Sequence, residues 1–211
     1  MILSFIRRPF KYRYTNVVLL LVGINCAVYI MTMMYPALKI ILSLNPLYFW
    51  YQKMYWQPFT YMFMHAGFQH LLFNMLGLLF FGIPLERTVG SKEFTLMYVL
   101  FGVLSGCISL LLFTVSGSVY TFLMGASGAI YGILLAYSVA FPRSSIYIWG
   151  LVPVPAPLLI VIYAIIAFGS QLAGSSGIAH ITHLSGFAVA WIYFIIRMGI
   201  NPLKAWKNAY R

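Results

Sequence analysis

Long apolar runs alternate with short polar segments along the whole chain. Several runs approach the length of about 17–25 largely apolar residues that a membrane-spanning helix needs. The alternation predicts an all-α membrane protein, a bundle of six transmembrane helices in a single domain over residues 1–211. The expected spans are residues 17–34, 67–81, 94–113, 127–140, 158–168 and 179–196.

The fourth expected span, residues 127–140, is unusually short. It forms roughly 21 Å of helix at about 1.5 Å per residue, whereas the hydrocarbon core of a bilayer is about 30 Å thick. A helix of this length that reaches the inner face begins well below the outer surface. We therefore expect its first residue, Ser127, to lie sunken in the membrane.

The segments outside the spans differ in kind. Residues 1–16 form a basic N-terminus, in which Thr15-Asn16 offers a cap for the first span, and residues 198–211 form a basic tail. Residues 37–57 are interrupted by a proline and are rich in Trp and Tyr, which favour the membrane–water interface. We expect this stretch to be a long interfacial loop in the outer leaflet.

Composition and charge indicate how the spans are oriented. The chain is 63% hydrophobic and 7% charged, whereas a soluble domain is about 25% charged. Six spans place both termini on one side, and the more basic side of a membrane protein faces the cytoplasm. The other side holds only Lys39 and Lys53, so the net charge of +11 is an orientation signal and we expect no nucleic-acid partner. The cations on the cytoplasmic side are Arg7, Arg8, Lys11, Arg13, Arg87, Lys92, Arg143, Arg197, Lys204, Lys207 and Arg211.

Six polar residues, which include every His of the chain, lie at the expected outer ends of three spans. Polar groups at this depth are costly unless they face a polar or water-filled cavity. We therefore expect a sunken cavity that opens to the outside. The six are His65, His70 and Asn74 near the start of the second span, Ser127 of the fourth, and His180 and His183 of the sixth.

Ser127 has the setting of a nucleophile. The start of a helix offers free backbone N–H groups and the positive end of the dipole, which suit a hydroxyl whose attack creates an oxyanion. Small residues such as Gly128 and Gly186 would let the fourth and sixth spans pack closely. Such packing would bring Ser127 within reach of His183 as a general base. The chain contains no Asp, so a Ser-His-Asp triad is excluded.

Three further side chains suit the same site. His70 and Asn74 are four residues apart on one helical face, and both can donate hydrogen bonds to an oxyanion. Tyr131, one turn after Ser127, could stack on the imidazole of His183 and hold it in place. Each feature also has a structural explanation, because small residues at this spacing pack membrane helices and a membrane His can bond between helices.

Four motifs together resemble those of the rhomboid family of intramembrane serine proteases. No single motif is specific, but the set is specific in its order, spacing and expected topology. The motifs are Gly-x-Ser-Gly at residues 125–128, His-x4-His-x3-Asn at His65, His70 and Asn74, Gly-x3-Glu-x3-Gly at Gly82, Glu86 and Gly90, and the base motif at residues 182–186.

The resemblance implies a fold, an activity and a set of roles. It implies a rhomboid-like bundle that cleaves single-span membrane proteins near the outer face of the bilayer, without a cofactor or metal. The small six-span form further suggests a prokaryotic plasma membrane. Ser127 would be the nucleophile and His183 the base of a dyad without an acid. The oxyanion hole would comprise His70, Asn74 and the Ser127 N–H, with support from His65, Tyr131, Gly125 and Gly128, and from Glu86 and Arg87 in the cytoplasmic turn.

Two positions depart from the family pattern. Gln57 stands where many members have Arg, which leaves the anchoring of the first loop open. Ser185 replaces a Gly beside the base and could shift the packing of the fourth and sixth spans. The fifth span and the Gly/Ser-rich residues 169–177 are expected to act as a mobile gate and cap.

Two other functions stay open. A catalytically silent rhomboid-like protein would bind membrane clients, although the presence of both Ser127 and His183 argues against it. A haem or metal protein would use the four His. His180 and His183 have ligand-like spacing, but no Cys or acid joins them.

Overall fold

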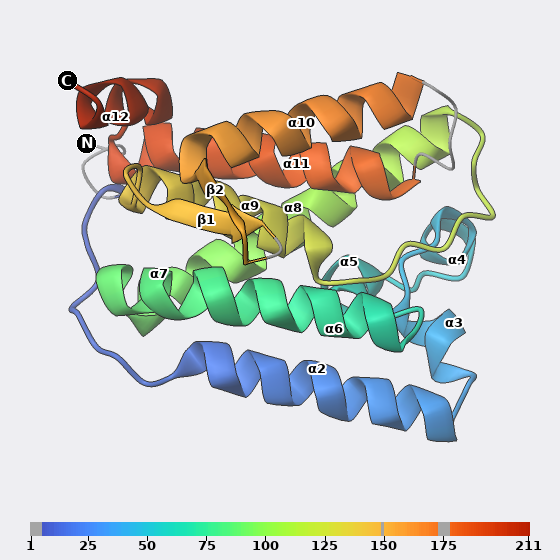
Figure 1. Ribbon diagram of the computed structural model, residues 1–211. Helices are drawn as coiled ribbons and strands as arrows, with labels where there is room; N and C mark the ends of the chain where they lie inside the picture. Colours follow the sequence, from blue (N-terminus) through green and yellow to red (C-terminus); the bar gives the residue numbers. More distant parts are fainter. Residues whose placement is uncertain (1–5, 149, 173–177) are drawn as a thin grey trace.

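The structure is a computed structural model that describes residues 6–148, 150–172 and 178–211. The described residues are mostly helical and include four helices that are long and apolar enough to cross a membrane. These are Val17–Met34, Phe68–Val89, Ser91–Val115 and His180–Met198, and the shorter apolar helices Ser127–Ala140 and Ala156–Gly169 accompany them. The chain is therefore a multi-pass membrane protein, and its long helices lie side by side (Figure 1).

The elements of the bundle follow the predicted order. They are α2 (Val17–Met34), α6 (Phe68–Gly77) with the π-helical turn η2 (Leu78–Gly82) and α7 (Ile83–Val89), α8 (Ser91–Val115), α9 (Ser127–Ala140), α10 (Ala156–Leu172), α11 (Ile178–Tyr193) with the π-helical turn η3 (Phe194–Met198), and α12 (Pro202–Ala209).

The second span is longer than predicted. The sequence placed its end near Pro84, but the helix continues through this residue to Val89. A proline in a helix lacks an N–H donor and crowds the preceding turn. The wider π-helical turn η2, which immediately precedes α7, is the kind of local adjustment that accommodates such a residue. The predicted end of this span was therefore wrong, whereas α2 and α9 have the predicted bounds.

A small hairpin departs from the all-α prediction. Strand β1 (Ser145–Ile148) pairs antiparallel with β2 (Val152–Pro155), and the hairpin lies beside the start of α10 (Figure 1). The prolines of this connector concealed it, because proline cannot donate to a strand ladder and is confined to edges. In a sheet of two strands both strands are edges, so the hairpin tolerates Pro153 and Pro155.

The aromatic stretch forms short helices, α3 (Leu38–Leu42), α4 (Pro46–Tyr51) and α5 (Gln57–Thr60), followed by the 3-10 turn η1 (Tyr61–Phe63). The buried side chain of Gln57 connects them. Its oxygen accepts from the backbone N–H of Asn45 at 3.1 Å, and its nitrogen donates to the carbonyl of Ile40 at 3.3 Å. An amide therefore anchors this loop at the position where the family pattern has a guanidinium.

The bundle has two chemically different ends. The basic end is where residues 6–16, the α7–α8 turn, η3 and α12 meet, and the C-terminus is marked there (Figure 1). The aromatic end is formed by residues 38–57 together with residues 116–123. A backbone bridge between Leu44 and Leu123 joins these two stretches.

One buried carboxylate at the basic end caps α2. Glu86 of α7 accepts hydrogen bonds from the backbone N–H groups of Val17 at 2.8 Å and Val18 at 3.0 Å, and from the hydroxyl of Ser91. A carboxylate on these first-turn groups also complements the helix dipole. Asn16, which the sequence favoured as part of the cap, has a φ of 56° and makes no side-chain cap. The cap prediction was wrong because the acceptor comes from a distant part of the chain.

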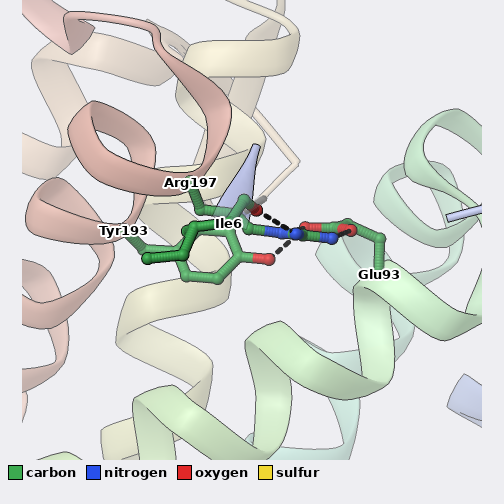
Figure 2. A network of polar contacts seen from close by, with 4 residues as sticks. All are labelled: Ile6, Glu93, Tyr193 and Arg197. Carbon is green, nitrogen blue, oxygen red and sulfur yellow. Dashed lines mark hydrogen bonds and ion pairs between the residues drawn. The ribbon is translucent and has the colours of Figure 1, made fainter. Parts of the chain in front are cut away.

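The second carboxylate, Glu93 of α8, joins α8 to the end of α11 (Figure 2). Arg197 forms an ion pair with it, with 2.7 Å between Nη2 and Oε2, and Tyr193 donates its hydroxyl to it. Arg197 also donates to the backbone carbonyl of Ile6. Both acids of the chain are thus engaged in holding helix ends together.

The central helices α8, α9 and α11 pack through small residues. A Cβ on Gly186 of α11 would lie 2.3 Å from the carbonyl oxygen of Gly128 on α9, so only glycine fits at this contact. Ser185, the neighbouring departure from the family pattern, donates its hydroxyl to the carbonyl of Ile181 in its own helix at 2.8 Å. The close contact of α9 and α11 is therefore kept.

Candidate active site

Ser127 opens α9 in the middle of the molecule. Residues 116–126 lead inward from the aromatic end, and α9 begins where they arrive (Figure 1). The side chain of Ser127 is partly exposed, and no side chain caps the helix at Ala126. The backbone N–H groups of the first turn of α9 are therefore not capped by a side chain at Ala126, and they lie beside the Ser127 hydroxyl.

His70 of α6 lies against the turn that precedes Ser127. Gly125 in this turn has a φ of 126°, a conformation that favours glycine. A Cβ at this position would lie 2.7 Å from Cε1 and 2.8 Å from Nε2 of His70. The backbone N–H of Gly125 donates to the carbonyl of Tyr61 at 3.0 Å, which holds the turn in place. The His70 ring thus lies against Gly125, which is two residues before Ser127 in the chain.

Asn74 and His65 stand on either side of His70 along the chain. Asn74 is buried, and one N–H of its side chain donates to the carbonyl of His70 at 2.7 Å. The amide carries a second N–H, so it keeps a donor. His65 is fully buried, with its ring centroid 5.2 Å from that of His70. Burial, with a smaller effect from His70, lowers the pKa of His65 to about 4, so this ring is neutral at pH 7.

His183 of α11 stacks on Tyr131 of α9. Their ring centroids are 3.9 Å apart and their planes differ by 6°. Tyr131 is one turn after Ser127, so the two residues share a face of α9. The stack and the Gly128–Gly186 contact bring His183 to this face. The described residues form no hydrogen bond between Ser127 and His183. Hydrogen bonds between catalytic groups are often long before substrate binds.

The remaining His and the two acids lie outside this arrangement. His180 is one turn before His183, and the two ring centroids are 6.3 Å apart. Glu86 and Glu93 are engaged at the basic end, away from the start of α9. Within the described ranges, no group of three or more His, Cys, Asp or Glu residues is arranged to hold a metal ion.

The rhomboid domain family matches residues 52–199, well over half of the chain. This chain belongs to the rhomboid family. The match includes every residue to which the sequence assigned a role in a Ser-His site.

Curated relatives match shorter stretches of this rhomboid domain. Rhomboid-related protein 3 of Homo sapiens is 43% identical over 54 residues, which are 26% of this chain and 13% of that protein. The putative rhomboid protease YdcA of Bacillus subtilis (strain 168) is 40% identical over 50 residues, 24% of this chain and 25% of that protein. Rhomboid-related protein 4 of Mus musculus is 42% identical over 67 residues, 31% of this chain and 21% of that protein. The matched part thus spans a quarter or less of each of these relatives.

Glu86 and Arg87 of the rhomboid domain both tie the α7–α8 turn to the N-terminal segment rather than to each other. Glu86 binds the start of α2 as described above. Arg87 is exposed, its Nε lies 3.4 Å from the hydroxyl of Tyr14, and its backbone carbonyl accepts from Tyr12 at 2.8 Å. They therefore support the fold at the end of the bundle opposite the aromatic loop.

The sequence did not single out two groups that support the site. Tyr61 is fully buried, and its hydroxyl donates to the carbonyl of Gly102 at 2.7 Å while its own carbonyl holds Gly125. Thr182, next to the predicted base, shares a hydrogen bond of 2.8 Å with Ser109 of α8. Tyr61 follows a run of interfacial aromatic residues, and no local signal separates it from them.

Proposed function

We propose that this rhomboid domain is a serine endopeptidase that hydrolyses peptide bonds within the membrane, with Ser127 as the nucleophile and His183 as the base. The observation that carries the proposal is the stack of His183 on Tyr131, one helical turn from Ser127. The contact of Gly186 with Gly128 supports the proposal, because it leaves no room for a side chain between α9 and α11 and so keeps the two helices close together.

The chemistry follows from these positions. The Ser127 hydroxyl attacks the scissile carbonyl while His183 takes its proton, and His183 then protonates the leaving amine. Water hydrolyses the acyl-enzyme by the reverse sequence of proton transfers. The oxyanion forms at the N-terminus of α9, where the Ser127 N–H and the helix dipole stabilise it. His70 and the free N–H of Asn74 are the proposed side-chain donors.

The dyad works without a carboxylate. In a Ser-His-Asp triad the acid holds the imidazole in the productive orientation. Here both acids are engaged at the basic end. We assign the orienting role to Tyr131, whose parallel ring fixes the plane of His183, and to the Ser109–Thr182 hydrogen bond, which fixes the adjacent turn of α11.

The proposed topology has six spans, with α9 and α10 crossing as short helices beside the four long ones. The basic end lies in the cytoplasm and the site opens towards the outside, in keeping with the positive-inside rule. The substrates are single-span membrane proteins, cleaved near the outer face. Because the backbone of a membrane helix is fully hydrogen-bonded, the substrate must be locally unwound before its carbonyls can react.

The proposed gate is α10. Its Tyr163 lies next to Tyr131, with 5.9 Å between the two ring centroids. The proposed cap, residues 169–177, lies largely outside the described residues. An engineered disulfide that ties α10 to α6 is expected to abolish cleavage and reduction is expected to restore it. Full activity in the oxidised protein would reject the gate.

Labelling with a fluorophosphonate tests the nucleophile without knowledge of the substrate. The wild type is expected to be labelled at Ser127, Ser127→Ala not at all, and His183→Ala far more slowly. His180→Ala is the matched control, because it removes an imidazole one turn away that has no part in the dyad, and it should label like the wild type. A folded wild type without label would remove the protease proposal and favour a protein that binds membrane clients.

A further inference from the structure

A groove of about 610 Å³ lies between α8 and α11 and reaches the basic end. Leu96, Leu100 and Leu104 line it from α8, and at spacings of four residues they form a row about 12 Å long. Ile192 and Ile196 face them from α11 and η3 and are themselves exposed. The groove is therefore apolar, runs along two membrane helices and is open at the protein surface.

The wall at the basic end is built by the N-terminal segment 6–16. The carbonyl of Ile6 accepts from Arg197, and the Arg197 guanidinium lies 4.8 Å from the ring centroid of Phe10. Further along, the carbonyl of Arg13 accepts from the backbone N–H of Ser91 at 2.7 Å. The segment is thus fixed across the ends of α8 and α11, and it closes the groove on this side.

Arg8 and Lys92, next to this end of the groove, form no ion pair or hydrogen bond among the described residues. Arg197 is paired with Glu93, and Arg7 donates to the carbonyls of Ile195 and Ile196. Arg8, in contrast, lines the groove and is exposed, and within the described ranges it forms no ion pair or hydrogen bond. Lys92 is likewise exposed and unpaired in the described part of the chain. It stands one turn before Leu96 on the same face of α8.

We propose that this groove binds a phospholipid with an anionic head group. An acyl chain lies along the leucine row of α8, and the phosphate pairs with Arg8 and Lys92 at the basic end. The leucine row is apolar over its length. Arg8 is the one cation without a partner among the described residues that line the groove, and it lies with Lys92 at the end where lipid phosphates of the adjoining leaflet are found. The site is separate from Ser127 and does not depend on the proposed proteolysis.

A second groove provides an internal comparison. It has a volume of about 700 Å³ and lies between α10 and α11, where Ile160, Phe187 and Trp191 are among its lining residues. None of the described residues that line it is charged. It can accommodate acyl chains, but it has no lining cation with which to select a head group. Head-group preference is therefore expected only at the α8–α11 groove.

Native mass spectrometry of the delipidated protein in an uncharged detergent tests the proposal. We expect tighter binding of one phosphatidylglycerol molecule than of phosphatidylcholine with the same chains. The double variant Arg8→Gln, Lys92→Gln should bind phosphatidylglycerol about 25-fold more weakly, because each cation near an anionic lipid contributes about five-fold. The matched control Lys204→Gln, which removes a cation of α12 outside the groove, should bind like the wild type. Ile192→Trp should block the chain and weaken binding of the lipid.

Four results would each overturn the proposal. Equal binding of the two lipids would show that no head group is selected, and unchanged binding by the double variant would show that Arg8 and Lys92 do not select it. Equal occupancy by glycerophosphoglycerol, the head group without chains, would indicate a simple anion site. A dimer that Ile192→Trp dissociates, without any lipid bound to the wild type, would make the groove an interface between two copies of the chain. Arg8 and Lys92 are exposed, so their substitution leaves the fold intact and the result with the double variant is decisive.

Discussion

At the basic end, two buried carboxylates each make several hydrogen bonds, whereas the start of α9 is arranged with no carboxylate at all. Glu86 and Glu93 connect helices that are far apart in the sequence. Around Ser127 the arrangement rests instead on ring stacking and on glycine contacts. The contrast indicates that this chain uses its acidic side chains to hold the bundle together and uses close helix packing to position the residues of the candidate site.

Gly125→Ala should have the largest effect on activity, because it should disrupt the candidate site. The added Cβ would lie 2.7 Å from the His70 ring, and the backbone there is in a conformation that favours glycine. Displacing one oxyanion donor lowers kcat by about 100-fold or more. Gly117→Ala is the matched control, because Gly117 also has a positive φ but nothing within 4 Å of the added carbon. Its kcat/KM should stay within about twofold of the wild type, and equal losses in both variants would attribute the effect to backbone strain alone.

Tyr131→Ala should have an intermediate effect. An aromatic pair contributes about 0.5–1.5 kcal/mol, so losing the stack should lower kcat/KM by up to about tenfold. Tyr131→Phe keeps the ring and should stay within about twofold. The rate of fluorophosphonate labelling should change in parallel with kcat/KM. If both variants label like the wild type, Tyr131 does not orient His183.

Glu86→Gln, at the basic end, should have the smallest effect on cleavage. The amide removes the negative charge at the start of α2 and replaces one of the two accepting oxygens with an NH2 group. This group would face the backbone N–H of Val17 or of Val18, donor against donor, which costs about 1–3 kcal/mol of stability. The melting temperature should therefore fall, while kcat/KM per folded molecule stays within about twofold. Loss of cleavage without loss of stability would contradict the division of roles between the two ends.

The sequence predicted the helices well where a single rule decides the outcome. The bounds of α2 and α9 follow from apolar runs between polar segments. The rule that proline ends helices failed at Pro84, because a π-helical turn allows the helix to continue, and the hairpin at residues 145–155 was concealed by its prolines. The Glu86 cap could not be predicted, since only the folded chain brings α7 to the start of α2.

The sequence indicated the residues of the candidate site, but it did not indicate how residues from different helices are arranged around it. Spacing along each helix indicated that His70 and Asn74 share a face and that Tyr131 lies one turn after Ser127. The contact of His70 with Gly125 depends on how α6 and α9 cross, which the periodicity of one helix does not encode. The supporting role of Tyr61 was missed for the same reason.

Cleavage of a single-span substrate in proteoliposomes by the wild type, Ser127→Ala and His183→Ala tests the Ser127–His183 dyad directly. We expect cleavage by the wild type and a loss of activity of at least about a thousand-fold in both variants. His180→Ala, the neighbouring imidazole, should cleave normally. Cleavage by Ser127→Ala at the wild-type rate would show that Ser127 is not the nucleophile, which would then lie elsewhere in this chain or outside it.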